Sequence, residues 1–88
     1  MNALSEASHR TNEVAAPIAE RAALTAIRVD SEDPWAHHAL GIAYLFMRRF
    51  DDSLAEFELA LRLNPNFSLA QGYYSLTFPI AGVGRRPT

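Results

Sequence analysis

Apolar residues recur at helical spacing along most of the chain, and the alternation typical of a strand is absent. The spacing predicts helices over residues 13–29, 34–47 and 51–63, and a fourth that starts near residue 67 and is disturbed at Pro79. Pro17 lies near the first turn of the first helix, where a proline is tolerated. The pattern therefore indicates an all-α protein.

Polar residues mark the ends of these helices. Asp33 before Pro34 is a helix-start signal, because the carboxylate can cap free N–H groups and the proline ring presets φ. The acidic residues 51–52 favour the start of the third helix, and the basic residues 48–49 favour the end of the second, since each complements the partial charge there. Residues 64–66, Asn-Pro-Asn, predict a turn.

The sequence matches itself at an offset of about 34 residues, a period typical of helical repeats. The segment 26–30, AIRVD, aligns with the segment 60–64, ALRLN. Three further pairs are similar: Ala36 with Ala70, Ile42 with Leu76, and Tyr44 with Phe78. Like residues thus recur at helix-packing positions.

The unit 34–67 resembles a tetratricopeptide repeat (TPR). That family places a large residue, Leu-Gly and Tyr in its first helix, and small, aromatic, small and proline positions in and after its second. The residues at these positions, with the aromatic that precedes the second helix, are His37, Leu40, Gly41, Tyr44, Phe50, Ser53, Phe57, Ala60 and Pro65. The resemblance implies that small residues let the two helices approach while aromatic rings fill the space between them. Two departures are His37, where Trp is usual, and Arg48, where the family often has Gly.

The resemblance implies antiparallel helix hairpins stacked as a short TPR-type α-solenoid. It covers residues 13–82, with one complete unit at 34–67 and partial units at 13–33 and 68–82. We expect a weakly structured segment at 1–12 and a loose tail at 83–88.

The resemblance also implies a protein–protein interaction scaffold or adaptor, which binds a protein or peptide through an apolar concave face formed by the first helix of each unit. The matching positions are Trp35, His38, Ile42, Leu45, Phe46, Leu69, Gly72, Tyr73, Leu76 and Ile80. Members that bind chaperone tails have Lys, Arg and Asn there, and this sequence has none of them. We therefore expect apolar and aromatic contact with the partner, although the same face could pack on neighbouring repeats or on a second copy.

Two alternatives stay open. The apolar segment 67–80 could make the chain a homo-oligomer that completes its repeats. The run of residues 33–76 is also similar to the TPR tails of bacterial multidomain proteins linked to nucleotide cyclases. That resemblance implies a truncated regulatory fragment of a larger enzyme.

Composition and charge narrow the function. The net charge is −2 and no basic stripe runs along the chain, which disfavours nucleic acid. There is no cysteine, and the longest uncharged stretch contains Pro79 and polar residues, so it reads poorly as a membrane span. Because residues 1–12 hold no apolar run that could serve as a signal peptide, we expect a cytoplasmic protein.

Candidate chemistry is sparse. His37 and His38 are adjacent, so on a helix they point about 100° apart and do not chelate one metal ion together. No nucleophile and base can be paired from the sequence. We expect neither catalysis nor a cofactor or metal site.

Overall fold

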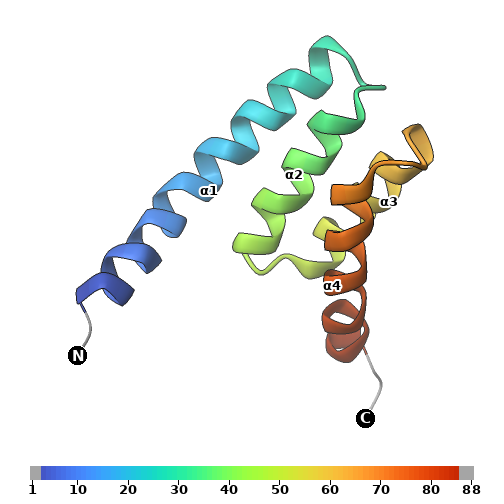
Figure 1. Ribbon diagram of the computed structural model, residues 1–88. Coiled ribbons are helices and arrows are strands. Elements are labelled where there is room, and N and C mark those ends of the chain that lie inside the picture. Colours follow the sequence, from blue (N-terminus) through green and yellow to red (C-terminus); the bar gives the residue numbers. More distant parts are fainter. Residues whose placement is uncertain (1–2, 86–88) are drawn as a thin grey trace.

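The computed structural model describes the backbone of residues 3–85 and the side chains of residues 14–81. Its four helices are α1 (Ala3–Val29), α2 (Pro34–Phe46), α3 (Phe50–Leu63) and α4 (Ser68–Arg85). Consecutive helices run antiparallel and each packs on the one before it, so α2 lies between α1 and α3 (Figure 1). Residues 3–85 contain no strand, and the predicted all-α fold of stacked helix hairpins is confirmed.

The turns explain why the helices break where they do. Asp33 accepts a hydrogen bond from the Trp35 N–H at 3.0 Å and caps α2, with Pro34 as its first residue. Between α2 and α3 the backbone of Arg48 has φ 60°, the left-handed region in which a residue with a Cβ is strained. This is the residue that stands where the TPR family often has glycine.

Both ends of the fold differ from the prediction. The first helix begins at Ala3 rather than at residue 13, so Pro17 lies inside α1 and residues 3–12 are helical rather than weakly structured. At the other end α4 runs past Pro79 to Arg85, so residues 83–85 are helical rather than a loose tail. A proline removes only one hydrogen bond from the ladder, and the buried Ala81 supplies packing beyond Pro79. Residues 1–2 and 86–88 lie outside the described part.

The internal repeat is visible in the hydrogen bonds of the α1–α2 turn and the α3–α4 turn. Equivalent backbone bonds run from Asp30 to Ala26 and from Asn64 to Ala60, both at 2.9 Å, and from Asp33 to Asp30 at 3.3 Å and Phe67 to Asn64 at 3.1 Å. The side chains of Asp30 and Asn64 also accept from the N–H two residues on, at 3.0 and 3.2 Å. Because the two turns share one geometry, α1 stands to α2 as α3 stands to α4.

The closest approach lies between α2 and α3. A Cβ placed on Gly41 would lie 2.7 Å from Cε1 of Phe57, whose ring is completely buried. Beside it the buried Ser53 hydroxyl donates to the Gly41 carbonyl at 2.6 Å. The small residue thus allows an aromatic ring to fill the interface without a cavity.

Candidate functional site: an apolar stripe on α2 and α4

Large apolar side chains, most of them exposed, follow one face of α2 and the equivalent face of α4. We call them the apolar stripe: Trp35, Ile42 and Phe46 on α2, and Leu69, Tyr73, Leu76 and Ile80 on α4. Residues spaced by three, four and seven positions share a helix face, which explains the alignment. Trp35 is 59% exposed, and Phe46, Leu69 and Leu76 are each more than half exposed. Such a run of large apolar groups in contact with water is unusual away from an interaction site.

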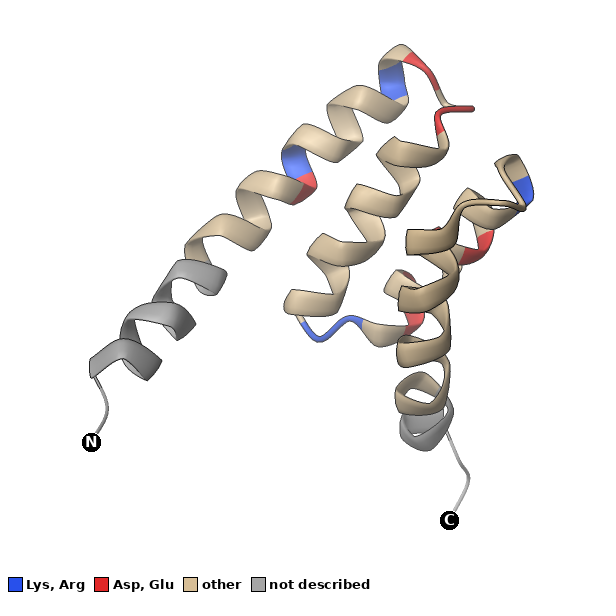
Figure 2. Ribbon diagram, viewed as in Figure 1, with Lys and Arg blue, Asp and Glu red and all other residues tan. Residues whose placement is uncertain are grey.

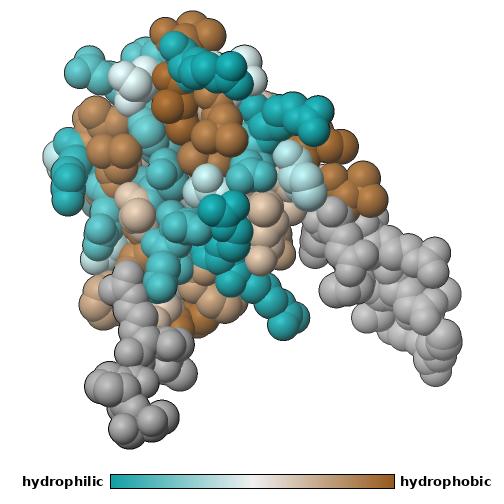
Figure 3. All heavy atoms as spheres, turned by 180° about the vertical axis from the view of Figure 1, so that it is seen from behind, coloured by the Kyte–Doolittle hydropathy of each residue, from teal (hydrophilic) through white to brown (hydrophobic). Residues whose placement is uncertain are grey.

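The stripe has no formal charge near it on its own helices. The sequence has no Asp, Glu, Lys or Arg between Asp33 and Arg48, nor between Arg62 and Arg85. In Figure 2 the charged residues of the described part gather on α1, on the turns and on α3, while α2 and the described part of α4 are uncharged. The view from behind in Figure 3 shows hydrophilic and hydrophobic residues interspersed. The two stripe helices therefore differ from the rest of the chain in charge.

Two hollows border the stripe. The one on α4 has a volume of about 370 Å³ and is lined by Ser68, Leu69, Gly72, Tyr73 and Leu76. A Cβ on Gly72 would meet no atom within 4 Å, so the missing side chain leaves this hollow open. The second, between α1 and α2, has a volume of about 140 Å³ and is lined by Ala15, Ala16, Ala19, Ile42, Ala43 and Phe46. Each hollow offers an apolar side chain a place to insert.

His38 does not belong to the accessible surface, which corrects the prediction. Its ring is buried and surrounded by aromatic rings, with centroids 4.9 Å from Phe67, 5.4 Å from Tyr73 and 5.5 Å from Phe57. The pKa of His38 is lowered because burial disfavours the charged ring. The reason is that α4 covers this position of α2. The equivalent residue of α4, Gly72, is exposed because none of the described helices lies beyond it.

The other residues that were predicted to line the binding face differ in how far they are buried. Leu45, Ile42 and Tyr73 are half-buried, and the Tyr73 ring stacks on Phe57 with centroids 5.6 Å apart. Trp35 packs on Phe67 at 4.6 Å and remains exposed on its other side. The stripe is thus anchored in the core at two aromatic residues.

His37 is a packing residue with polar partners. Its Nδ1 lies 2.8 Å from Oε1 of Glu56 on α3, and its Nε2 lies 2.8 Å from the Ser31 carbonyl oxygen. Burial opposes the charged ring, but these two hydrogen bonds and the nearby carboxylates of Glu56 and Asp33 leave the pKa of His37 above its ordinary value of 6.5. In α4 the equivalent residue, Gln71, donates to the Pro65 carbonyl at 2.7 Å. The same position thus ties each of these helices to the turn before it.

The remaining packing positions divide by exposure. Leu40, Gly41, Ser53, Phe57 and Ala60 are buried, Tyr44 and Phe50 are half-buried, and Pro65 is exposed.

Arg49 takes a role that the sequence did not reveal. Its guanidinium lies 4.2 Å from the Tyr44 ring centroid, pairs with Asp52 at 2.9 Å and reaches Glu20 of α1 at 3.2 Å. Since α2 ends at Phe46, this residue links three helices rather than closing one of them. Only the spacing to Asp52, three residues on, was a signal for part of this.

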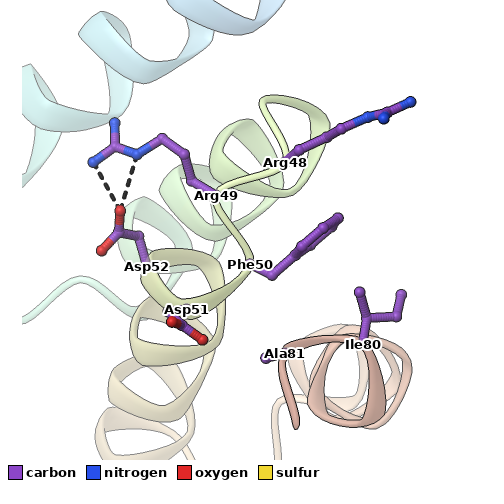
Figure 4. Close-up of a pocket in the computed structure, with 7 residues that line it drawn as sticks. All are labelled: Arg48, Arg49, Phe50, Asp51, Asp52, Ile80 and Ala81. Atoms are coloured by element: carbon purple, nitrogen blue, oxygen red, sulfur yellow. Dashed lines mark hydrogen bonds and ion pairs between the residues drawn. The ribbon is translucent and has the colours of Figure 1, made fainter. Parts of the chain in front are cut away.

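A third hollow, of about 360 Å³, lies between the α2–α3 turn and the last turns of α4. Its lining residues are Arg48, Arg49, Phe50, Asp51, Asp52, Ile80 and Ala81. In Figure 4 the Phe50 side chain extends from the turn on the side where Ile80 and Ala81 lie, and Arg49 is paired with Asp52. Within the described side chains no three His, Asp or Glu residues gather as metal ligands would.

The comparison with protein families agrees with the geometry of α2 and α3. Residues 34–67 match the tetratricopeptide repeat family, so the predicted complete unit is confirmed. The match gives no support to the similarity with cyclase-linked tails. Comparisons with curated proteins and with solved structures found no match to this chain. None of the helices described here is long and apolar enough to span a membrane.

Proposed function

We propose that this chain is a protein-interaction module without catalysis, and that it binds a peptide segment of a partner along the apolar stripe. The observation that carries the proposal is the recurrence of large apolar residues, all exposed except the half-buried Ile42, at equivalent positions of α2 and α4: Trp35 with Leu69, Ile42 with Leu76, and Phe46 with Ile80. A repeat-spaced row is suited to an extended or helical segment that crosses both helices.

The charge pattern indicates the chemistry of the partner. Because the stripe helices present no Lys or Arg, a terminal carboxylate or a phosphate group would find no counter-ion there. Affinity would instead come from apolar burial, at about 25 cal/mol per Å² of apolar surface removed from water. We therefore propose a segment with aliphatic or aromatic side chains on one face, one of them seated in the hollow beside Gly72.

The single tryptophan provides the test, since Trp35 lies at one end of the stripe. A peptide library would be selected on the immobilised chain, and the binders titrated while Trp35 fluorescence is followed. We expect selected peptides to be enriched in apolar residues and to shift the emission of Trp35. Leu76→Glu should weaken binding more than tenfold, because the carboxylate would be desolvated at the centre of the stripe.

Ala55→Glu is the matched control. Ala55 is exposed on α3, which carries none of the stripe residues, so this variant should retain the affinity of the original chain. Peptides that bind Leu76→Glu as tightly as the original chain would place the binding surface elsewhere. The emission of Trp35 would also be followed in the peptide-free chain. A blue shift that grows with protein concentration would show that a second copy covers the stripe.

A further inference from the structure

Helix α4 has a second unpartnered face, distinct from the apolar stripe. Gln71, Ser75 and Phe78 lie on it; all three are exposed, and Phe78 is 54% exposed. Tyr74 borders this face: its ring centroid lies 5.7 Å from that of Phe78, and its hydroxyl donates to Glu58 of α3 at 3.3 Å. We call the face formed by Gln71, Ser75 and Phe78 the end face. Among the described residues no helix packs on it.

The repeat itself shows what kind of element fits the end face. The equivalent residues of α2 are His37, Gly41 and Tyr44, and these are the residues that meet α3. His37 bonds to Glu56, Gly41 lies against Phe57, and Tyr44 lies beneath Arg49. By this template the end face receives a helix that packs on α4 as α3 packs on α2.

The chain contains a second helix of the α3 kind, with its matching face unused. Helix α1 occupies the position of α3 relative to the following helix, as the equivalent turns show. Ala15, Ala19 and Ala22 of α1, all exposed, correspond to Arg49, which precedes α3, and to Ser53 and Glu56 within it. Small, uncharged residues allow a close approach to Phe78, which is large and also uncharged.

Helix length agrees with this pairing. Helices α1 and α4 have 27 and 18 residues, whereas α2 and α3 have 13 and 14. The two helices with unused faces are thus the two longest. Neither free face carries a formal charge among Ala15, Ala19, Ala22, Ser75 and Phe78.

We infer that α1 of a second copy packs on the end face of α4, so that copies join head to tail and continue the stack of helix hairpins. The contact is heterologous: it uses one surface of each copy and leaves the other free. Such contacts extend with concentration unless the rotation between copies closes a ring. This pairing needs no bound peptide, although Ala15 and Ala19 also line the smaller hollow beside the stripe.

The test uses two variants that each remove one side of the contact. Phe78→Glu places a carboxylate on the end face. Ala19→Glu places one on the free face of α1, at the position that corresponds to the buried Ser53. We expect the original chain to sediment as a series of species that grows with concentration, and each variant alone to sediment as a 9.8 kDa monomer. A 1:1 mixture of the two variants should form a dimer and nothing larger, because only one intact pair of faces remains.

Ala55→Glu is the matched control, since Ala55 is an exposed alanine of α3 whose equivalent in α1, Arg21, is also exposed. It should assemble as the original chain does, and circular dichroism should show all variants equally helical. A monomeric original chain at millimolar concentration would overturn the inference. So would a mixture of the two variants that stays monomeric, or an Ala19→Glu chain that still assembles.

Discussion

At the scale of single residues, the two described glycines, one on α2 and one on α4, have opposite effects. Gly41 is buried and leaves room for Phe57, whereas Gly72 is exposed with nothing near its missing side chain. Glycine inside a helix lowers stability by about 1 kcal/mol relative to alanine, because it loses more backbone freedom on folding. Its cost at position 41 is offset only by the packing that it permits.

We therefore expect alanine substitutions at these two positions to change stability in opposite directions. Gly41→Ala should lower the free energy of unfolding by about 1–3 kcal/mol, because its Cβ would have to push the buried Phe57 ring aside. Gly72→Ala should raise it by up to about 1 kcal/mol through helix propensity alone. Urea denaturation followed by circular dichroism measures both values. A stable Gly41→Ala would mean that α2 and α3 are further apart than described here.

Some of these residue roles follow from the sequence and others do not. The repeat pattern predicts a small residue at position 41 facing an aromatic one, because both positions belong to one hairpin. The burial of His38 was missed because it depends on α4, which is the first helix of the following unit. The sequence shows that Arg48 stands where the repeat often has glycine. Only the backbone angle shows that Arg48 keeps the left-handed conformation that a glycine would adopt there.

At the scale of helices, His37 joins α2 to α3 and to the α1–α2 turn. Its two ring nitrogens face the carboxylate of Glu56 and the carbonyl of Ser31, so a protonated ring can donate to both. Gln71 makes only the carbonyl bond at the equivalent position of α4. A glutamine at position 37 would therefore remove the charge of the ring while keeping the hydrogen bond to the turn.

We expect the substitution His37→Gln to remove a pH-dependent part of the stability. The folded pKa of His37 is raised above the ordinary 6.5, so its contribution is fully present below pH 6.5 and is lost as pH rises through the folded pKa. The original chain should gain stability over His37→Gln on acidification from pH 8 to pH 6, by about 1 kcal/mol, the net contribution of a typical hydrogen bond. Denaturation curves at each pH give the difference.

The other buried histidine, His38, changes the stability with pH in the opposite direction. The pKa of His38 is lowered by burial, so its effect is a loss of stability as pH falls below 6.5 towards the folded pKa. It is present in both chains and cancels in their difference. A difference between the original chain and His37→Gln that does not change with pH would show that folding leaves the pKa of His37 at its ordinary value.

The starts of α2 and α3 were predicted from the sequence, whereas the start of α1 and the end of α4 were not. The caps at Asp33 and the acidic first turn of α3 are local signals, and both helices start within one residue of the prediction. The ends of α1 and α4 were misjudged because Pro17 and Pro79 were given too much weight as helix breakers. A single missing hydrogen bond is outweighed when the neighbouring turns pack on another helix, and that packing is not a local property.

At the scale of the whole molecule, the helices form a stack in which each one contacts mainly its neighbours in sequence. Contact between α2 and α4 is slight, and α1 and α4 each pack extensively on one helix only. Stability in such a stack is approximately the sum of local terms and nearest-neighbour interfaces. The free faces of α1 and α4 follow from this arrangement, since sequence pattern gives the helices but not which neighbours are present.

The stack leads us to expect a gradient of hydrogen exchange along the chain. In the Phe78→Glu chain, which we expect to be monomeric, amides in the centres of α2 and α3 should exchange slowest, because both helices are packed on two sides. Amides of α4 beyond Pro79 should exchange at least about tenfold faster, since that end packs on one side and the proline removes a bond. Exchange followed by NMR resolves individual amides.

Two substitutions distinguish a gradient of hydrogen exchange, in which helices open separately, from unfolding of the whole chain at once. Phe57→Leu should speed exchange in α2, α3 and α4 together, because the ring contacts Gly41 and stacks on Tyr73. Ala81→Gly should speed exchange in α4 alone, since it lowers helix propensity beyond Pro79 without touching α2. Equal acceleration of all four helices by Ala81→Gly would mean that the molecule unfolds as one unit. In the original chain, raising the concentration should slow exchange in α1 and α4 and leave α3 unchanged, because head-to-tail contact covers those two helices alone.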